Sequence, residues 1–216
     1  PVLTNYGSSN TADTNCLRTY LSPDLNQFKG KDAYNIQFQL YGTNKCIDVG
    51  TTQNKKKSRM DGDIKIHDCH NMNSGDAKYQ LFRLDNEHRI VSEYGRNKGS
   101  LEQYPEQNPG VLNVWGGDPA KSEDIKSGDK IKLAGDGHGK LAQKFTYDPE
   151  NLRIKMEDAQ QWCINLKDSK VENNNRIIIY KCNDHRDQRW KVIHRNYGNF
   201  DPANAAKYKR EVMGGN

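Results

Sequence analysis

The sequence has few apolar residues and no long run of them. Apolar side chains make up 33% of the 216 residues, and the mean hydropathy is −1.05. No stretch approaches the roughly 18 consecutive apolar residues of a transmembrane helix, so we expect no membrane span. A chain of this length and composition favours one domain, with two small ones as the alternative, built from many short strands or held by covalent cross-links.

The cysteines lack the spacing of a metal site or a redox motif. No CxxC pair occurs, so neither a zinc cluster nor a thioredoxin-type motif is expected. Four cysteines can pair within local loops, which indicates an oxidising compartment and a secreted, extracellular protein. The five are Cys16, Cys46, Cys69, Cys163 and Cys182.

Positive charge is modest and scattered. The net charge is +5, and the one short lysine run is Lys55-Lys56-Lys57. Aromatic residues do not alternate with basic ones along any stretch. This pattern argues against nucleic acid as a partner.

No motif of an enzyme stands out. Gly135 to Lys140 is rich in glycine, but Leu141 follows where a phosphate-binding loop needs Ser or Thr. His67 to His70 resembles a metal or nucleophile cluster, but alternate residues of a strand point to opposite faces. We therefore expect no catalysis, no metal and no cofactor.

Short apolar runs separated by turn residues predict an all-β fold, either a sandwich or a barrel. Turn signals between the runs include Asp61-Gly62 and Gly116-Gly117. The expected strands lie within 36–40, 64–66, 79–84, 89–91, 130–133, 144–147, 152–156, 176–180 and 188–193.

Three blocks of sequence recur in the same order, which indicates internal repeats. NKCIDV (44–49) matches QWCINL (161–166), and IKIHDC (64–69) matches IIIYKC (177–182). A weaker middle copy contains GSLEQY (99–104) and KIKLAG (130–135). Each copy ends in a Gln-x-aromatic motif, namely Gln80-Leu81-Phe82, Gln143-Lys144-Phe145 and Gln188-Arg189-Trp190.

These imperfect repeats resemble the ricin B-chain-like β-trefoil lectin family over about residues 36–194. The resemblance implies three lobes around a pseudo-threefold axis, with twelve strands forming a six-stranded barrel and a cap of three hairpins. The expected repeats span about 36–86, 87–149 and 150–194, between an N-terminal extension (1–35) and a C-terminal tail (195–216).

The resemblance also implies which residues hold the fold together. It pairs Cys46 with Cys69 and Cys163 with Cys182, and it leaves Cys16 either free or linked to another chain. Leu101 and Gly135 take the cysteine positions of the middle copy, which would have no disulfide. The expected core residues are Phe82, Phe145, Trp190, Ile64, Ile66, Ile177 and Ile179.

Lobes of this family hold a shallow sugar pocket, in which an aromatic ring stacks on the sugar, an acidic residue binds its hydroxyls, and an Asn–Gln pair supplies further polar contacts. The resemblance therefore implies that Gln80 and Gln188 contact a sugar. In the third lobe the resemblance places Tyr180 as the ring. Asn165 stands where Asp is usual, and Asp187 stands where Asn is usual before Gln188. The Asp and Asn identities are thus exchanged.

The other lobes depart further from the family pattern. The first lobe keeps Asp48, with His67 at the ring position, Lys65 on the same strand face, and Tyr79 before Gln80. The second lobe has Gln103 and Leu133 at the key positions, so we expect no sugar there. An insertion is expected at about 105–129, and its Trp115 is expected either to cover the barrel surface or to form a separate contact patch.

The resemblance implies a secreted lectin module that recognises galactose or N-acetylgalactosamine on cell-surface glycans and glycoproteins. One alternative is the receptor-binding or delivery part of a secreted bacterial toxin, joined to a partner chain or toxin subunit through Cys16. A second alternative is a trefoil with inactive pockets that binds protein surfaces.

Overall fold

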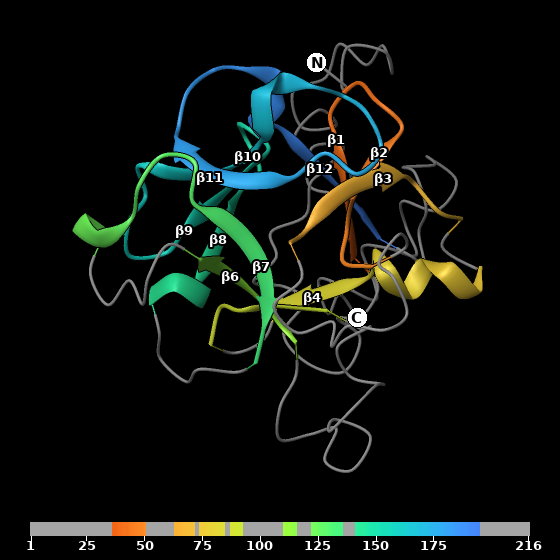
Figure 1. The fold of residues 1–216 in the computed structure, drawn as a ribbon, viewed down its shortest axis with the longest axis horizontal. Helices are drawn as coiled ribbons and strands as arrows, with labels where there is room; N and C mark the ends of the chain where they lie inside the picture. Colours follow the sequence, from red (N-terminus) through yellow and green to blue (C-terminus); the bar gives the residue numbers. More distant parts are fainter. Residues whose placement is uncertain are drawn as a thin grey trace, which may run out of the picture.

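The computed structural model describes residues 36–50, 63–71, 74–84, 87–92, 110–115, 122–135 and 141–194. The expected N-terminal extension with Cys16 and the expected C-terminal tail lie outside the described residues. Within these ranges the chain forms β-strands, short 3₁₀ helices and turns, and no α-helix (Figure 1). The predicted all-β class is therefore confirmed.

Twelve strands follow one another along the described part of the chain. They are β1 (Ile36–Leu40), β2 (Lys45–Asp48), β3 (Lys65–Asp68), β4 (Phe82–Leu84), β5 (Ile90–Ser92), β6 (Val111–Trp115), β7 (Lys130–Ala134), β8 (Phe145–Asp148), β9 (Arg153–Met156), β10 (Trp162–Leu166), β11 (Ile177–Lys181) and β12 (Trp190–His194). The 3₁₀ helices are η4 (Gly75–Tyr79), η6 (Ser122–Asp124), η7 (Leu141–Gln143), η8 (Lys167–Ser169) and η9 (Arg186–Gln188).

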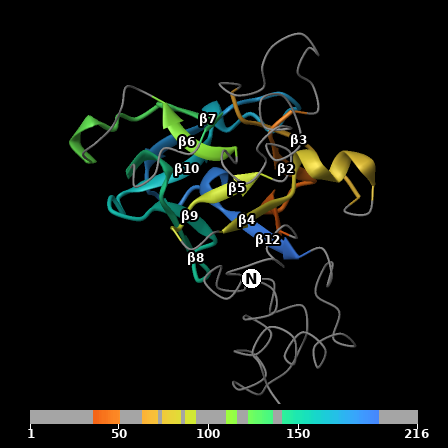
Figure 2. The ribbon, with the colours of Figure 1, turned by 90° about the horizontal axis from the view of Figure 1, so that it is seen from below.

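Six of the strands close into a barrel. β1 pairs with β12 and β4, β4 pairs with β5, and β8 pairs with β9 (Figure 2). The amide of Phe145 donates to the carbonyl of His88 at 2.8 Å, which joins β8 to β5. The amide of Trp190 donates to the carbonyl of Leu152 at 2.6 Å, which joins β12 to β9. The ring of strands is thereby complete.

The other six strands form three hairpins that cap one end of the barrel: β2–β3, β6–β7 and β10–β11. β3, β7 and β11 lie around the middle of Figure 1 and bond to one another. The amide of Ile64 donates to the carbonyl of Ile131 at 2.9 Å, and that of Ile177 donates to Ile64 at 3.1 Å. A barrel capped by three such hairpins is a β-trefoil.

The predicted core residues are buried. Phe82, Phe145 and Trp190, the aromatic residues of the three Gln-x-aromatic motifs, are at most 1% exposed. Burial of each such ring contributes about 2–3 kcal/mol of folding free energy. The four predicted isoleucines of the cap hairpins are 0% exposed and extend this core, namely Ile64, Ile66, Ile177 and Ile179.

Two disulfides cross-link the first and third cap hairpins. Cys46 bonds to Cys69, and Cys163 bonds to Cys182, which are the pairs that the resemblance implied. They close loops with sequence separations of 23 and 19 residues. Loops of this size correspond to about 3 kcal/mol of stabilisation each in the chain-entropy model.

The middle lobe differs from the sequence prediction. An insertion at about 105–129 is wrong, because Val111–Trp115 is strand β6 and pairs along its whole length with β7. Leu133 lies opposite Leu112 and is 1% exposed, so it belongs to the core and not to a pocket. A shift of one residue moves a strand side chain to the other face, and the predicted alignment of β7 was shifted in this way. Leu101 and Gln103 lie outside the described residues.

Candidate functional site

The glutamines of the three Gln-x-aromatic motifs make the same kind of hydrogen bond in each lobe. Gln80, Gln143 and Gln188 are at most 2% exposed. Each donates a 2.9 Å hydrogen bond from Nε2 to a main-chain carbonyl at the end of the long cap strand before it. The three acceptors are the carbonyl oxygens of Asp68, Gly135 and Lys181.

Two of these glutamines also fix the loop that follows the cap strand. The Oε1 atoms of Gln80 and Gln188 accept 2.8 Å hydrogen bonds from the amides of His70 and Asn183. Both side chains have an exposed fraction of 0%. The implied direct contact of Gln80 and Gln188 with a sugar therefore does not fit, because neither amide reaches the surface. Each instead positions the neighbouring strand end.

In the third lobe an exposed aromatic ring lies beside two nearly buried polar side chains. Tyr180 on β11 is 42% exposed, whereas Asn165 on β10 is 6% exposed. Tyr180 pairs in register with the disulfide-bonded Cys163, and Asn165 pairs with Ile178. Asn165 donates from Nδ2 to the carbonyl of Leu166 at 2.6 Å. The ring and the amide thus lie on the same outward face of one hairpin.

Asp187 supplies a carboxylate to the same lobe. It belongs to η9, which packs against β10, and the bond from Gln188 to Lys181 ties η9 to the strand that carries Tyr180. Asp187 is 8% exposed. Its Oδ2 accepts a 2.8 Å hydrogen bond from the hydroxyl of Ser169, whereas its buried Oδ1 has no hydrogen-bond partner. A buried carboxylate oxygen without a partner is rare in folded proteins, which marks Asp187 as a candidate functional residue.

Sequence reasoning did not identify Ser169. Asp168 and Ser169 adopt φ values of 52° and 53°, in the left-handed region that residues other than glycine rarely occupy. This turn after β10 brings the Ser169 hydroxyl to the Asp187 carboxylate. The Asp-Ser pair is itself a weak turn signal, because Asp tolerates the left-handed region and both residues are common in turns, but it does not show that Ser169 meets Asp187.

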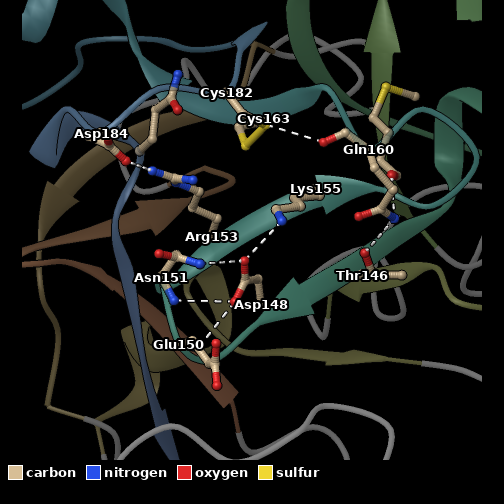
Figure 3. A network of polar contacts seen from close by, with 12 residues as sticks. Thr146, Asp148, Glu150, Asn151, Arg153, Lys155, Gln160, Cys163, Cys182 and Asp184 are labelled. Atoms are coloured by element: carbon tan, nitrogen blue, oxygen red, sulfur yellow. Dashed lines mark hydrogen bonds and ion pairs between the residues drawn. A yellow bond between two sulfur atoms is a disulfide. The ribbon is translucent and has the colours of Figure 1, made fainter.

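Figure 3 shows the polar contacts of the β8–β9 hairpin, which leads into the third lobe. The Asp148 carboxylate accepts hydrogen bonds from the amides of Glu150 and Asn151 and pairs with Lys155 at 2.9 Å. Burial acts to raise the pKa of Asp148, but the bonds from Lys155 and Asn151 outweigh it, and the pKa lies below the ordinary value. The carboxylate therefore serves to hold the turn.

In the first lobe both carboxylate oxygens of the expected acidic residue already accept hydrogen bonds. Asp48 is 4% exposed, and its Oδ1 accepts from the amide of Gly50 at 2.8 Å. Its Oδ2 accepts from Nε2 of Gln80 at 3.1 Å and lies 3.7 Å from Nε2 of His70. A ligand at Asp48 would have to share these contacts. The first lobe is therefore less prepared for a sugar than the third.

Two histidines replace the usual aromatic ring of the first lobe. His67 and His70 stack with ring centroids 5.6 Å apart, and the buried Nδ1 of His67 has no hydrogen-bond partner. Tyr79 is partly buried, with the ammonium of Lys78 5.3 Å from its ring centroid. His70 was not among the predicted site residues, although its amide bond to Gln80 holds it there.

The glutamine bonds show which residues of the second lobe correspond to the pockets of the others. His67, Ala134 and Tyr180 each precede the carbonyl that a motif glutamine binds. Ala134 therefore takes the ring position, and no aromatic side chain is available there for stacking. Asn113 corresponds to Asn165, since its Nδ2 likewise donates to the next carbonyl, at 2.9 Å.

In the part of the chain that the structure describes, no group of three or more His, Cys, Asp or Glu side chains is arranged to hold a metal ion. Among the same residues, no helix is long and apolar enough to cross a membrane.

No protein-family model and no curated protein sequence matches the chain. Solved structures do match, at low identity. The C-half of an earthworm R-type lectin in complex with GalNAc is 12% identical, with a TM-score of 0.52, and the match covers 73% of this chain and 97% of that one. ThreeFoil, a designed threefold symmetric protein, is 11% identical, with a TM-score of 0.50 and coverage of 73% and 96%.

A third match is an agglutinin from Abrus precatorius. It is 13% identical, with a TM-score of 0.52, and the match covers 79% of this chain and 51% of that one. Identities this low show a shared fold. The three matches support the β-trefoil architecture, including its threefold repetition.

Proposed function

We propose that the chain is a carbohydrate-binding module whose principal site lies in the third lobe. The observation that carries the proposal is the ring of Tyr180, which is 42% exposed on the same hairpin face as Asn165, in the lobe where Oδ1 of Asp187 has no partner. A pyranose has an apolar face that stacks on an aromatic ring and a rim of hydroxyls that bind convergent polar groups. Tyr180, Asn165 and Asp187 supply this combination.

Galactose or N-acetylgalactosamine is the ligand class we propose. One of the structural matches, the C-half of the earthworm lectin, is in complex with GalNAc. The resemblance to the ricin B-chain-like family implies the same class. Binding alone, without catalysis, is the proposed activity, and the first-lobe residues Asp48, His67 and Tyr79 form a proposed weaker site.

The proposed location is extracellular, on cell-surface glycans or glycoproteins. Two disulfides favour an oxidising compartment. A toxin-delivery subunit would use the same glycan site but would also have a partner chain joined through Cys16. Non-reducing electrophoresis of the natural protein distinguishes a simple lectin from such a complex.

Isothermal titration with galactose, N-acetylgalactosamine and glucose tests the proposal. We expect the wild-type chain to bind the first two sugars more tightly than glucose. Tyr180→Ala should weaken binding at least about tenfold, because the stacking ring is lost, and Tyr180→Phe should keep most of it. Asp187→Ala should weaken binding to a similar extent because a buried acceptor is removed.

Val171→Ala is the matched control, since Val171 is another exposed apolar side chain of the third lobe. It should leave both sugar binding and thermal stability unchanged. The proposal fails if the wild-type chain binds neither galactose nor N-acetylgalactosamine, or if Tyr180→Ala binds them as well as the control does.

A further inference from the structure

The outer surface of the hairpin cap has its own pattern of side chains. Three cross-strand rows run over it, and the alternate residues of β3, β7 and β11 point inward as buried Ile and Leu side chains. The row members therefore point outward from the barrel. The rows are Asp48–Lys65–Arg176, Asn113–Lys132–Asp63 and Asn165–Ile178–Lys130–Trp115.

Positive charge gathers where these rows meet. Lys65, Lys130, Lys132 and Arg176 lie on neighbouring strands, which are spaced by about 5 Å. They come from β3, from β7 and from the start of β11, the three strands at the middle of Figure 1. We define these four cations together with Trp115 as the cap face.

Two carboxylates lie in the same rows and offset part of this positive charge. Asp63 pairs with Nε of Arg176 at 2.8 Å, and Asp48 accepts from Gly50 and Gln80. Within the described ranges, neither Lys65 nor Lys130 forms an ion pair. The four cations outnumber the two carboxylates of these rows, Asp48 and Asp63, so the cap face keeps a net positive charge that favours an anion.

An exposed indole adjoins the cations. Trp115 is 44% exposed, and the ammonium of Lys132 lies 4.2 Å from its ring centroid. Lys130 is the cross-strand neighbour of Trp115. An exposed ring with one ammonium group beside it and a second lysine on the neighbouring strand suits a pyranose that carries a negative group, because the sugar face packs on the indole and the anion pairs with the lysines.

We propose that the cap face binds an anionic glycan chain carrying sulfate groups, at a site separate from the third-lobe pocket. A lone aromatic ring offers no platform for stacking successive bases, which argues against single-stranded nucleic acid. The cap face also lacks an apolar patch that would enter a bilayer. This site does not depend on the proposed third-lobe function, since it uses none of Tyr180, Asn165 and Asp187.

Titration of the full chain with a heparin-derived hexasaccharide, followed by tryptophan fluorescence and calorimetry, tests this proposal. We expect binding in about 50 mM NaCl, no binding of the desulfated hexasaccharide, and strong weakening near 0.5 M NaCl. Lys130→Gln with Lys132→Gln should weaken binding at least about tenfold, since each exposed charge is worth roughly three- to fivefold. Trp115→Ala should weaken it several-fold.

Lys170→Gln is the charge-matched control, since Lys170 is an exposed lysine on the loop after η8. It should bind the hexasaccharide like the wild type, and so should Tyr180→Ala. Thermal unfolding checks that each variant is folded. Lys65→Gln removes a further charge of the cap face and should also weaken binding. The proposal is overturned if the wild type does not bind, if the double variant binds like Lys170→Gln, or if only phosphatidylserine vesicles or DNA bind.

Discussion

The side-chain amide of Gln188 donates a 2.9 Å hydrogen bond to the main-chain carbonyl of Lys181. The bond joins η9, which carries Asp187, to the strand that carries Tyr180. The same side chain accepts from the amide of Asn183. A fully buried residue thus fixes how the two elements that carry the candidate pocket residues lie.

Gln188→Ala should therefore destabilise the fold more than an exposed glutamine does. It leaves two main-chain groups without their partner, which costs about 2–4 kcal/mol of unfolding free energy. Gln160→Ala is the control, since Gln160 is exposed on the same lobe (Figure 3) and should cost less than about 1 kcal/mol. Urea unfolding measures both, and equal losses would contradict the assigned role of Gln188.

Two of the three tryptophans, Trp190 and Trp115, should differ in how much their substitution lowers the unfolding free energy. Trp190 is 0% exposed and donates from Nε1 to the carbonyl of Ile164 at 3.0 Å. Trp190→Phe should cost about 1–3 kcal/mol, because volume and a buried hydrogen bond are lost. Trp115→Ala should change the unfolding free energy by less than about 0.5 kcal/mol. A larger loss at Trp115 than at Trp190 would contradict the described core.

Much of the fold could be predicted from the sequence because its signals were local. The motif aromatics Phe82, Phe145 and Trp190 mark the three repeats, and all three are buried. The cysteines mark the first and third hairpins. The middle hairpin has no cysteine, so β6 went unnoticed. In β7 the alternation Lys130-Ile131-Lys132-Leu133 places both lysines on the outer face. The alignment of KIKLAG with IIIYKC ignored this alternation and placed Leu133 at the ring position.

The candidate site was predicted only in part, for physical reasons. Tyr180, Asn165 and Asp187 could be placed from the repeat, because strand alternation fixes their faces. The burial of Gln80 and Gln188 could not be predicted. The sequence of a motif is the same whether its polar side chain binds the main chain or a ligand. Ser169 reaches Asp187 through a turn that no local residue type signals.

The two disulfides should stabilise the fold to a similar degree. Their sequence separations are 23 and 19 residues, and loop-closure entropy varies slowly with loop length. Removing either pair as a double alanine variant should cost about 3 kcal/mol of unfolding free energy. Chemical unfolding of each variant measures this loss. A loss confined to one pair would show that native-state strain or residual structure dominates.

Loss of the Cys163–Cys182 pair should also weaken galactose binding, because Cys163 lies opposite Tyr180 in the hairpin. Removal of the Cys46–Cys69 disulfide is the matched control, since that disulfide cross-links a different lobe. Calorimetric titration compares the two under conditions where both variants are folded. Equal weakening by both would indicate a general effect of stability and not a local one.

Asp148 should make the unfolding free energy depend on pH in the acidic range. The pKa of Asp148 in the folded chain lies below the ordinary value of 3.8, because the bonds from Lys155 and Asn151 outweigh burial. Its contribution is therefore present above about pH 4 and is lost as the pH falls through the folded-state pKa. Asp148→Asn should cost less than about 1 kcal/mol at pH 7 and nothing at lower pH. A difference that stays constant from about pH 7 to pH 2 would contradict this.

A crystal structure of the chain with galactose bound tests the central claim most directly. The account predicts density for the sugar in the third lobe, with its apolar face against Tyr180 and a hydroxyl within hydrogen-bonding distance of Oδ1 of Asp187. It also predicts that Gln188 keeps its bond to Lys181 and does not touch the sugar. Galactose bound only at another lobe, or an empty third lobe at saturating sugar, would contradict the account.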